Sequence, residues 1–166
     1  MPTLRAATPA DLPAIAAIHA HAVRHTPAVF RDEPLPQAEW AAWIRSDHPT
    51  RVAEVAGAVA GYIAARPYAP GYSGYDGMAW VSVYVHHGAR GQGLGRALMA
   101  DLIAACRARG LRELVSRIAR PNDASEGLHR AFGFEPVGVY KRAGVKFGRQ
   151  FDVALYQLGL GEVEPG

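Results

Sequence analysis

The sequence predicts one domain of the α+β (mixed α/β) class, built on a single sheet. Its 166 residues fit one domain of ordinary size. About half of the residues are hydrophobic and a fifth are charged, which is typical of a globular protein. The apolar periodicity gives the order helix, helix, several strands, helix, strand, helix, strand, strand. We expect a single domain over residues 1–166, with its core at about 3–160 and a tail at 161–166.

Two helices are predicted near the N-terminus. Thr8 can accept hydrogen bonds from first-turn N–H groups, Pro9 fits the first helical position, and Asp11 complements the helix dipole. Apolar residues then recur at helical spacing from Leu12. A second helix is expected at 37–45, with three large side chains on one side, Trp40, Trp43 and Ile44.

Strands follow the two helices. Residues 51–56 and 58–66 are alternating segments joined at Gly57. Residues 67–77 hold five Gly or Pro residues and three tyrosines, so they form a loop, and a long loop in a compact domain is more often functional than idle. Residues 79–85 give the strongest strand signal of the chain.

The second half alternates helices and strands. A helix from about Gly93 to Arg109 carries a buried stripe and is ended by Gly110. A strand at 113–118 precedes a short helix at 123–132, which Asn122 caps, and 134–140 and 151–158 are the last two strands. The stripe consists of Leu94, Leu98, Leu102, Ile103 and Cys106.

Composition excludes several classes. Lys and Arg exceed Asp and Glu by only 18 to 15, a surplus too small and scattered for a nucleic-acid partner. No segment has the roughly 18 apolar residues of a membrane span, and the start of the chain lacks the apolar core of a signal peptide. The single cysteine, Cys106, cannot form an internal disulfide. We expect a cytoplasmic protein with no nucleic-acid or membrane partner.

The segment Arg90-Gly91-Gln92-Gly93-Leu94-Gly95 joins the strongest strand to a helix. Glycines at alternate positions let backbone N–H groups approach a ligand, and the first amides of a helix favour anions. The segment therefore predicts a pyrophosphate site, flanked by Arg90 and Arg96. The glycine spacing differs from both the dinucleotide fingerprint and the P-loop, and on the glycines alone a flexible turn is an equally good reading.

Arg-x-x-Gly-x-Gly after Val83-Tyr84-Val85 resembles the acetyl-CoA signature of the GNAT superfamily. Within it, the downstream segments resemble the phosphinothricin (methionine sulfoximine) N-acetyltransferase group; these are Asn122-Asp123-Ala124-Ser125, Leu128-His129, Phe132-Gly133-Phe134-Glu135 and Val145-Lys146-Phe147-Gly148-Arg149. The resemblance runs from about residue 3 to 160. It implies a central, mostly antiparallel sheet flanked by helices, with a splayed strand pair at the cofactor site. It also implies an enzyme that transfers acetyl from acetyl-CoA, as co-substrate, to the amine of a small molecule.

The resemblance assigns roles to residues. The backbone of Val83, Tyr84 and Val85 would contact the pantetheine arm, with the Val85 amide as the oxyanion donor. Asn122 and Ser125 would bind the cofactor arm. The pyrophosphate would be bound by Arg90, Gly91, Gln92, Gly93, Leu94, Gly95 and Arg96. A homodimer is implied as well.

Two features depart from the group, and a third residue, His129, differs from many members of the wider superfamily. Trp80 occupies the place of the usual glutamate and cannot accept a proton from an ammonium. The loop lacks the arginines that would hold an anionic amino acid; Tyr72, Tyr75 and an aspartate in their place favour an aromatic or cationic acceptor, with Phe30, Tyr72, Tyr75 and Trp80 as candidate substrate-binding residues. His129 stands where many superfamily members have a tyrosine as general acid; it is either that acid or a packed histidine.

Several alternatives stay open. Asp76, His86 and Tyr140 are candidates for the missing base. The chain is also compatible with a protein or peptide amine acetyltransferase, or with a catalytically silent acetyl-CoA sensor. We expect no metal, because no third ligand accompanies His86-His87 or the helical pair of His21 and His25. Cys106 is expected to pack in the core rather than act as a nucleophile.

Overall fold

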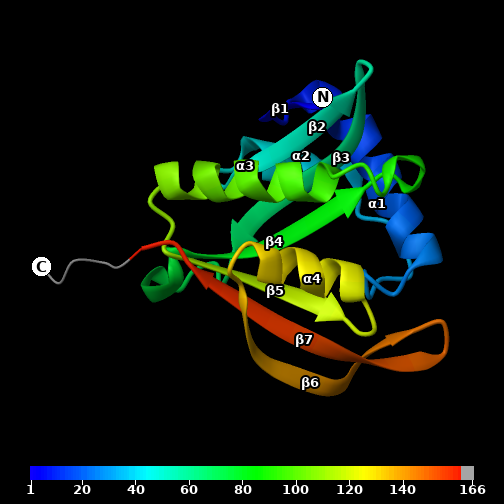
Figure 1. Cartoon of the computed structure of the whole chain (residues 1–166), viewed down its shortest axis with the longest axis vertical. Coiled ribbons are helices and arrows are strands. Elements are labelled where there is room, and N and C mark those ends of the chain that lie inside the picture. Colours follow the sequence, from blue (N-terminus) through cyan, green and yellow to red (C-terminus); the bar gives the residue numbers. More distant parts are fainter. Residues whose placement is uncertain (162–166) are drawn as a thin grey trace, which may run out of the picture.

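The computed structural model describes residues 1–161, so residues 162–166 of the predicted tail lie outside the described part. Seven strands form one sheet in the order β1-β2-β3-β4-β5-β7-β6 (Figure 1). All neighbours are antiparallel except β4 and β5. The predicted α+β class and mostly antiparallel sheet are confirmed. The elements are β1 (Thr3–Ala6), α1 (Leu12–His25), α2 (Gln37–Arg45), β2 (Thr50–Val55), β3 (Ala58–Pro67), β4 (Met78–Val85), α3 (Leu94–Ala108), β5 (Glu113–Ala119), α4 (Asp123–Ala131), β6 (Glu135–Lys146) and β7 (Arg149–Gly159), with short 3-10 turns η1 (Pro9–Asp11), η2 (Ser73–Tyr75) and η3 (His87–Ala89).

The sheet opens between β4 and β5. These parallel strands pair only over Met78–Trp80 and Glu113–Val115. Beyond that point β4 continues to Val85 and β5 to Ala119 without pairing to each other. The implied splayed strand pair is therefore confirmed, and one backbone edge of β4 is left without a neighbouring strand.

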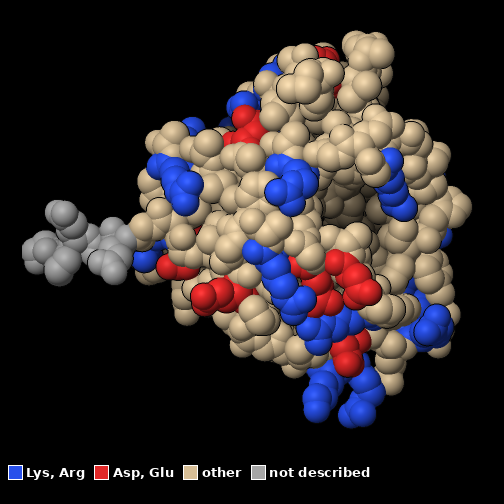
Figure 2. All heavy atoms as spheres, in the orientation of Figure 1, with Lys and Arg blue, Asp and Glu red and all other residues tan. Residues whose placement is uncertain are grey.

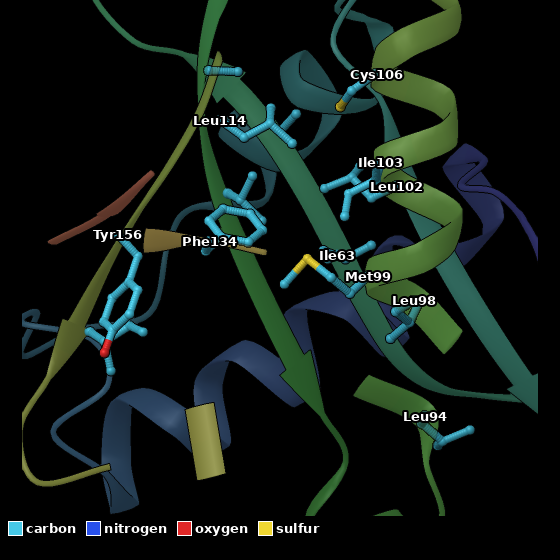
Figure 3. Packing of buried hydrophobic residues seen from close by; sticks show 14 of the residues in the cluster. Ile63, Leu94, Leu98, Met99, Leu102, Ile103, Cys106, Leu114, Phe134 and Tyr156 are labelled. Carbon is cyan, nitrogen blue, oxygen red and sulfur yellow. The ribbon is translucent and has the colours of Figure 1, made fainter. Parts of the chain in front are cut away.

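Helices cover both faces of the sheet. The stripe of α3 packs on one face, and Figure 3 shows its side chains pointing toward the strands, with Leu114, Phe134 and Tyr156 in the same cluster. All five predicted stripe residues are buried. On the other face, α1 and α2 form a second cluster with the sheet, made of Leu12, Ile15, Ile18, Trp40, Val52 and Tyr62. Among the described residues, no helix is both long and apolar enough to cross a membrane.

The N-terminal strand β1 was not predicted from sequence. It pairs with β2, and Arg5 on it donates hydrogen bonds of 2.7 and 2.8 Å to the carboxylate of Asp11. Asp11 also accepts from the backbone N–H of Thr8, as the carboxylate half of a capping box in which Thr8 is the N-cap residue. Asp11 organises the helix start because the buried carboxylate needs charge-assisted partners.

The C-terminal hairpin is longer than predicted. Strand β6 extends to Lys146, where the sequence indicated an end at residue 140. Two irregularities in its register, at Pro136/Gly138 and Tyr140/Gly144, let it continue past Arg142, which has a positive φ of 53°. The β6–β7 hairpin projects beyond the rest of the sheet (Figure 1) and forms one side of the site described below.

Candidate active site

The glycine segment turns the chain from β4 into α3. Gly91 and Gly93 have φ of 76° and 77°, a left-handed conformation that side chains disfavour. The first helical hydrogen bond here is donated by Ala97 to the carbonyl of Gly93. The N–H groups of residues 94–96 therefore precede the helical ladder and lie at the positive end of the α3 dipole.

The unpaired edge of β4 adds further N–H groups. The N–H of His86 donates to Ala60 of β3 at 2.8 Å. Because successive N–H groups of a strand point to opposite sides, those of Val83 and Val85 point away from β3 and into the opening between β4 and β5. The carbonyl of Val81 faces the same way, since it lies 3.5 Å from Ser116 Oγ on β5.

A groove of about 360 Å³ connects these two sets of donors. Figure 2 shows the surface hollowed beside the start of α3, with basic side chains on both sides of the hollow. Residues of α1 and the loop after it, of β4, of the start of α3, of the end of β5 and of α4 line this groove. They are Ala22, Thr26, Pro27, Ala28, Val83, Tyr84, Val85, Arg90, Gly95, Ala119, Pro121, Asn122, Ala124, Ser125 and Leu128.

Most predicted cofactor residues meet at this groove. Those that line it are Val83, Tyr84, Val85, Arg90, Gly95, Asn122 and Ser125. Gly91, Gln92, Gly93, Leu94 and Arg96 are beside it but do not line it. The Leu94 side chain is buried in the core, and the Arg96 guanidinium lies 5.5 Å from the Phe132 ring. Of these residues, Leu94 and Arg96 can contribute backbone N–H groups.

Asn122 has a structural role as well. Its Oδ1 accepts from the N–H of Ser125 at 3.1 Å, which caps α4 as predicted. Gly95 faces Leu128 of α4, where an added Cβ would lie 3.4 Å from the leucine side chain, an ordinary van der Waals contact. Both residues line the groove.

A second hollow of about 580 Å³ lies on the α1 and α2 face of β4. It contains two of the four predicted substrate-binding residues, Phe30 and Trp80, and also Tyr140. Tyr72 and Tyr75 do not line it. Tyr72 is 70% exposed, and the Tyr75 ring contacts Tyr68, which in turn contacts Trp80. The full lining is Ala28, Val29, Phe30, Trp80, Val81, Ser82, Tyr84, Arg117, Ala119, Tyr140, Ala143, Gly144, Val145 and Val153.

Arg117 is the residue of this hollow that sequence reasoning missed. Its guanidinium lies 4.2 Å from the centre of the Trp80 ring. The register explains the contact, since Trp80 pairs with Val115 and Arg117 is two residues further along the same face of β5. The only sequence signal was a charged residue near the middle of a strand that also carries Glu113 and Ser116.

His129 borders the opening from the α4 side but is only 2% exposed. Its Nδ1 lies 2.7 Å from the carbonyl of Ser125, and its Nε2 lies 2.8 Å from Ser116 Oγ. A carbonyl can only accept, so Nδ1 carries the proton and Nε2 accepts from Ser116. Burial lowers the pKa of His129, which favours this neutral form.

The two histidine pairs named from the sequence, His86-His87 and His21 with His25, form one cluster. Stacked or tilted rings connect His21 to His25, His21 to His87, and His86 to His87, at centroid distances of 4.1 to 4.5 Å. Within residues 1–161 no group of three or more His, Cys, Asp or Glu side chains could hold a metal ion.

The three candidate bases are scattered. Tyr140 lines the second hollow, whereas His86 lines a smaller one beside α1, where its Nδ1 accepts from the N–H of Gly88. Asp76 lines neither of these hollows nor the groove. Burial raises the pKa of Cys106 to about 12, which suits the packing role predicted for it and not a nucleophile.

Comparison with known proteins agrees with this geometry. A family model described as "Acetyltransferase (GNAT) family" matches residues 15–134. An L-methionine sulfoximine/L-methionine sulfone acetyltransferase of Pseudomonas aeruginosa is 41% identical over 95% of this chain and 94% of its own. The yncA protein of Salmonella typhimurium, solved with its cofactor acetyl-CoA, is 36% identical and superposes with a TM-score of 0.93 over 99% of this chain and 96% of its own. A phosphinothricin acetyltransferase of Sinorhizobium meliloti in complex with acetyl-CoA is also 36% identical, with a TM-score of 0.92 over 98% and 90% of the two chains. The chain belongs to the GNAT family of acetyltransferases.

Proposed function

We propose that the protein is an N-acetyltransferase that moves the acetyl group of acetyl-CoA to the amine of a small molecule. One observation carries the proposal: the N–H groups at the start of α3 and those of Val83 and Val85 face the same groove. One set suits a diphosphate, and the other suits an amide-bearing arm and a thioester carbonyl. Homologues with acetyl-CoA bound support the identity of the cofactor.

The residues present fit acetyl-CoA. Gly91 and Gly93 keep side chains away from the α3 start, and Arg90 adds positive charge at the mouth of the groove. Asn122 and Ser125 would bind the arm from α4. Gln92, Leu94, Gly95 and Arg96 complete the proposed pyrophosphate site. Bound acetyl-CoA supplies the activated thioester.

The reaction joins the acceptor nitrogen to the acetyl carbonyl carbon, releases coenzyme A as a thiol, and frees one proton. In the proposal, the Val85 N–H stabilises negative charge on the carbonyl oxygen, an effect typically worth about 3 kcal/mol. The second hollow shares Ala28, Tyr84 and Ala119 with the groove. It would hold the acceptor, with Phe30 and Trp80 among its contacts. Tyr72 and Tyr75 have no part in this proposed site.

His129 is assigned a positioning role. A neutral imidazole whose Nδ1 proton is bound to a carbonyl has no proton on Nε2 to give to a thiolate. We therefore propose that it orients the Ser116 hydroxyl at the opening, in place of the direct general-acid role suggested by the sequence. A thiol of pKa near 8.5 needs little assistance to leave.

The acceptor amine must be neutral to react. An alkyl amine of pKa near 10 is only about 0.1% neutral at pH 7. Trp80 cannot accept its proton, so Tyr140 or a water molecule in the hollow takes that part in the proposal.

The homodimer and the cytoplasmic location stay predictions. The exposed apolar side chains Val137, Val139, Val145 and Phe147 on and beside the outer strand β6 support a dimer, because such a surface favours association. Sedimentation at several concentrations would test this part of the proposal.

Calorimetry with acetyl-CoA, followed by thiol release across a panel of amines, tests the main proposal. We expect binding and amine-dependent release of coenzyme A. A protein amine acetyltransferase would instead prefer peptides, and an acetyl-CoA sensor would bind without turnover. Absence of coenzyme A binding by the folded protein would overturn the proposal.

A further inference from the structure

The acceptor hollow has an unusual distribution of charge. Of the side chains that line it in the described part of the chain, Arg117 alone carries a formal charge at neutral pH. The others are aromatic, aliphatic or uncharged polar. A cation in an otherwise neutral hollow attracts one negative charge, and the Arg117 side chain is exposed, so a ligand can reach it from solvent.

Arg117 is held but not neutralised. Its guanidinium lies over the Trp80 ring, and the indole is fixed in turn by a hydrogen bond of 3.2 Å from Nε1 to the carbonyl of Tyr68. No hydrogen bond or ion pair joins the Arg117 side chain to another residue within 1–161. Stacking uses the flat face of a guanidinium and leaves the N–H groups at its edge available, in the planar arrangement that matches a carboxylate.

The position of Arg117 places it on the acceptor side. It lines the hollow beside Trp80 and the small space between β4 and β5, but not the groove assigned to the cofactor. Arg90 is the cation of that groove. The two arginines therefore serve two different anions in the proposed function.

The opposite side of the hollow is apolar. Phe30 lies against Gly144, so closely that a Cβ on Gly144 would overlap its ring. Tyr140 and Val145 continue this wall from β6. The wall offers contact area to an uncharged side chain and has no partner for a second anionic group.

From this geometry, and resting on the proposed acetyl transfer, we propose that Arg117 stacked on Trp80 is a carboxylate-binding subsite. It selects α-amino acids that carry one negative charge and an apolar or aromatic side chain. The carboxylate binds at Arg117, the side chain packs against Phe30 and Tyr140, and the amine points along β4 toward the opening. The cationic acceptor considered from the sequence is disfavoured, because Arg117 would repel it.

The test uses matched acceptors and matched variants. L-Phenylalanine, L-leucine and L-methionine are compared with their amides, which lack the carboxylate, and with L-glutamate and phosphinothricin, which carry additional negative charge. Thiol release from acetyl-CoA gives kcat and KM for the wild type, Arg117→Gln, Arg117→Lys and the control Arg107→Gln. Arg107 is exposed near the C-terminal end of α3 and lies outside both the groove and the hollow.

We expect Arg117→Gln to raise KM for the free apolar amino acids at least tenfold while kcat changes less than threefold. KM for the amides should stay within about twofold, since they make no charge-assisted bond to Arg117. Arg117→Lys should recover part of the loss, and Arg107→Gln should match the wild type. Glutamate and phosphinothricin should have at least tenfold lower kcat/KM than the apolar amino acids.

Two other outcomes are distinguishable. If Arg117→Gln raises KM by the same factor for free amino acids and for amides, or raises it for neither, the carboxylate subsite is wrong and the proposed acetyl transfer still stands. If coenzyme A binds and no amine in any panel causes thiol release, the proposed function fails and the subsite fails with it.

Discussion

The Ser116 hydroxyl donates a hydrogen bond of 2.8 Å to Nε2 of His129, which joins β5 to α4 at the base of the opening in the sheet. Both side chains are buried, so each satisfies a polar atom that water cannot reach. Removal of either one leaves the other without its main partner.

A double-mutant cycle tests this pair. Ser116→Ala and His129→Leu should each lower the free energy of unfolding by about 1–3 kcal/mol, the usual cost of an unpaired buried polar group. The double variant should lose clearly less than the sum, because no polar atom is then left behind. Urea unfolding gives the three values, and strict additivity would show that the two groups act independently.

Gly93→Ala should weaken acetyl-CoA binding at least tenfold, because the added Cβ forces the backbone out of its left-handed conformation at the start of α3. Gly57→Ala is the control, since Gly57 has a similar φ of 80° in the β2–β3 turn. Both variants should lose about 1–2 kcal/mol of stability. Only Gly93→Ala should change the calorimetric affinity; equal affinities in the two variants would argue against the proposed pyrophosphate site.

Gly144→Ala should displace Phe30 and change KM for the acceptor severalfold, while KM for acetyl-CoA stays the same. The reason is steric, since the new Cβ and the Phe30 ring would occupy the same space. Gly138→Ala on the same strand meets open space and should behave as the wild type. Steady-state kinetics with one substrate saturating separates the two constants, and an unchanged acceptor KM in Gly144→Ala would remove Phe30 from the pocket.

Lys146→Met should loosen the segment that carries Phe30. Lys146 is a buried residue, with 4% of its surface exposed. Its ammonium donates hydrogen bonds of 2.6 Å to the carbonyls of Val29 and Arg31. Their loss should lower stability by about 1–3 kcal/mol and raise the acceptor KM. Lys141→Met, at an exposed position of β6, is the control. Equal melting temperatures for the two variants would contradict this role.

His19 predicts a pH dependence of stability. Burial lowers its pKa to about 4, below the 6.5 of an unfolded chain. As the pH falls, the unfolded state therefore binds the proton before the folded state does. The contribution of neutral His19 to the free energy of unfolding is complete above pH 6.5 and is lost as the pH falls toward 4. The loss amounts to about 3 kcal/mol. In His19→Leu the stability should vary less over this range than in His25→Leu, an exposed control; parallel curves would contradict the shift.

Local patterns predicted most of the fold because most elements have a clear period or boundary residue. The stripe of α3 and the cap at Asn122 are of this kind. Strand β1 has only four residues, and its stability comes from pairing with β2 and from the Arg5–Asp11 contact, which no local pattern contains. The extension of β6 likewise depends on its partner β7.

The side of the groove formed by β4 and the start of α3 was predictable because residues 83–96 are neighbours in the chain, whereas its α4 side, with Asn122 and Ser125, came from the family resemblance. The acceptor hollow was not, because its residues come from distant segments. Arg117 meets Trp80 only through the register of two parallel strands. The tyrosines of the 67–77 loop had a suitable composition, but the loop directs Tyr72 and Tyr75 away from the hollow.

The short pairing of β4 with β5 has a mechanical consequence. The sheet has a four-stranded part, β1 to β4, and a three-stranded part, β5 to β7. Only three residue pairs join the two parts, so backbone hydrogen bonding between them is sparse. A cofactor arm that bonds to the free edge of β4 and to α4 would act as a substitute strand and hold the two parts together. Occupancy of the groove should then slow amide hydrogen exchange in β5 and β7, far from the diphosphate itself.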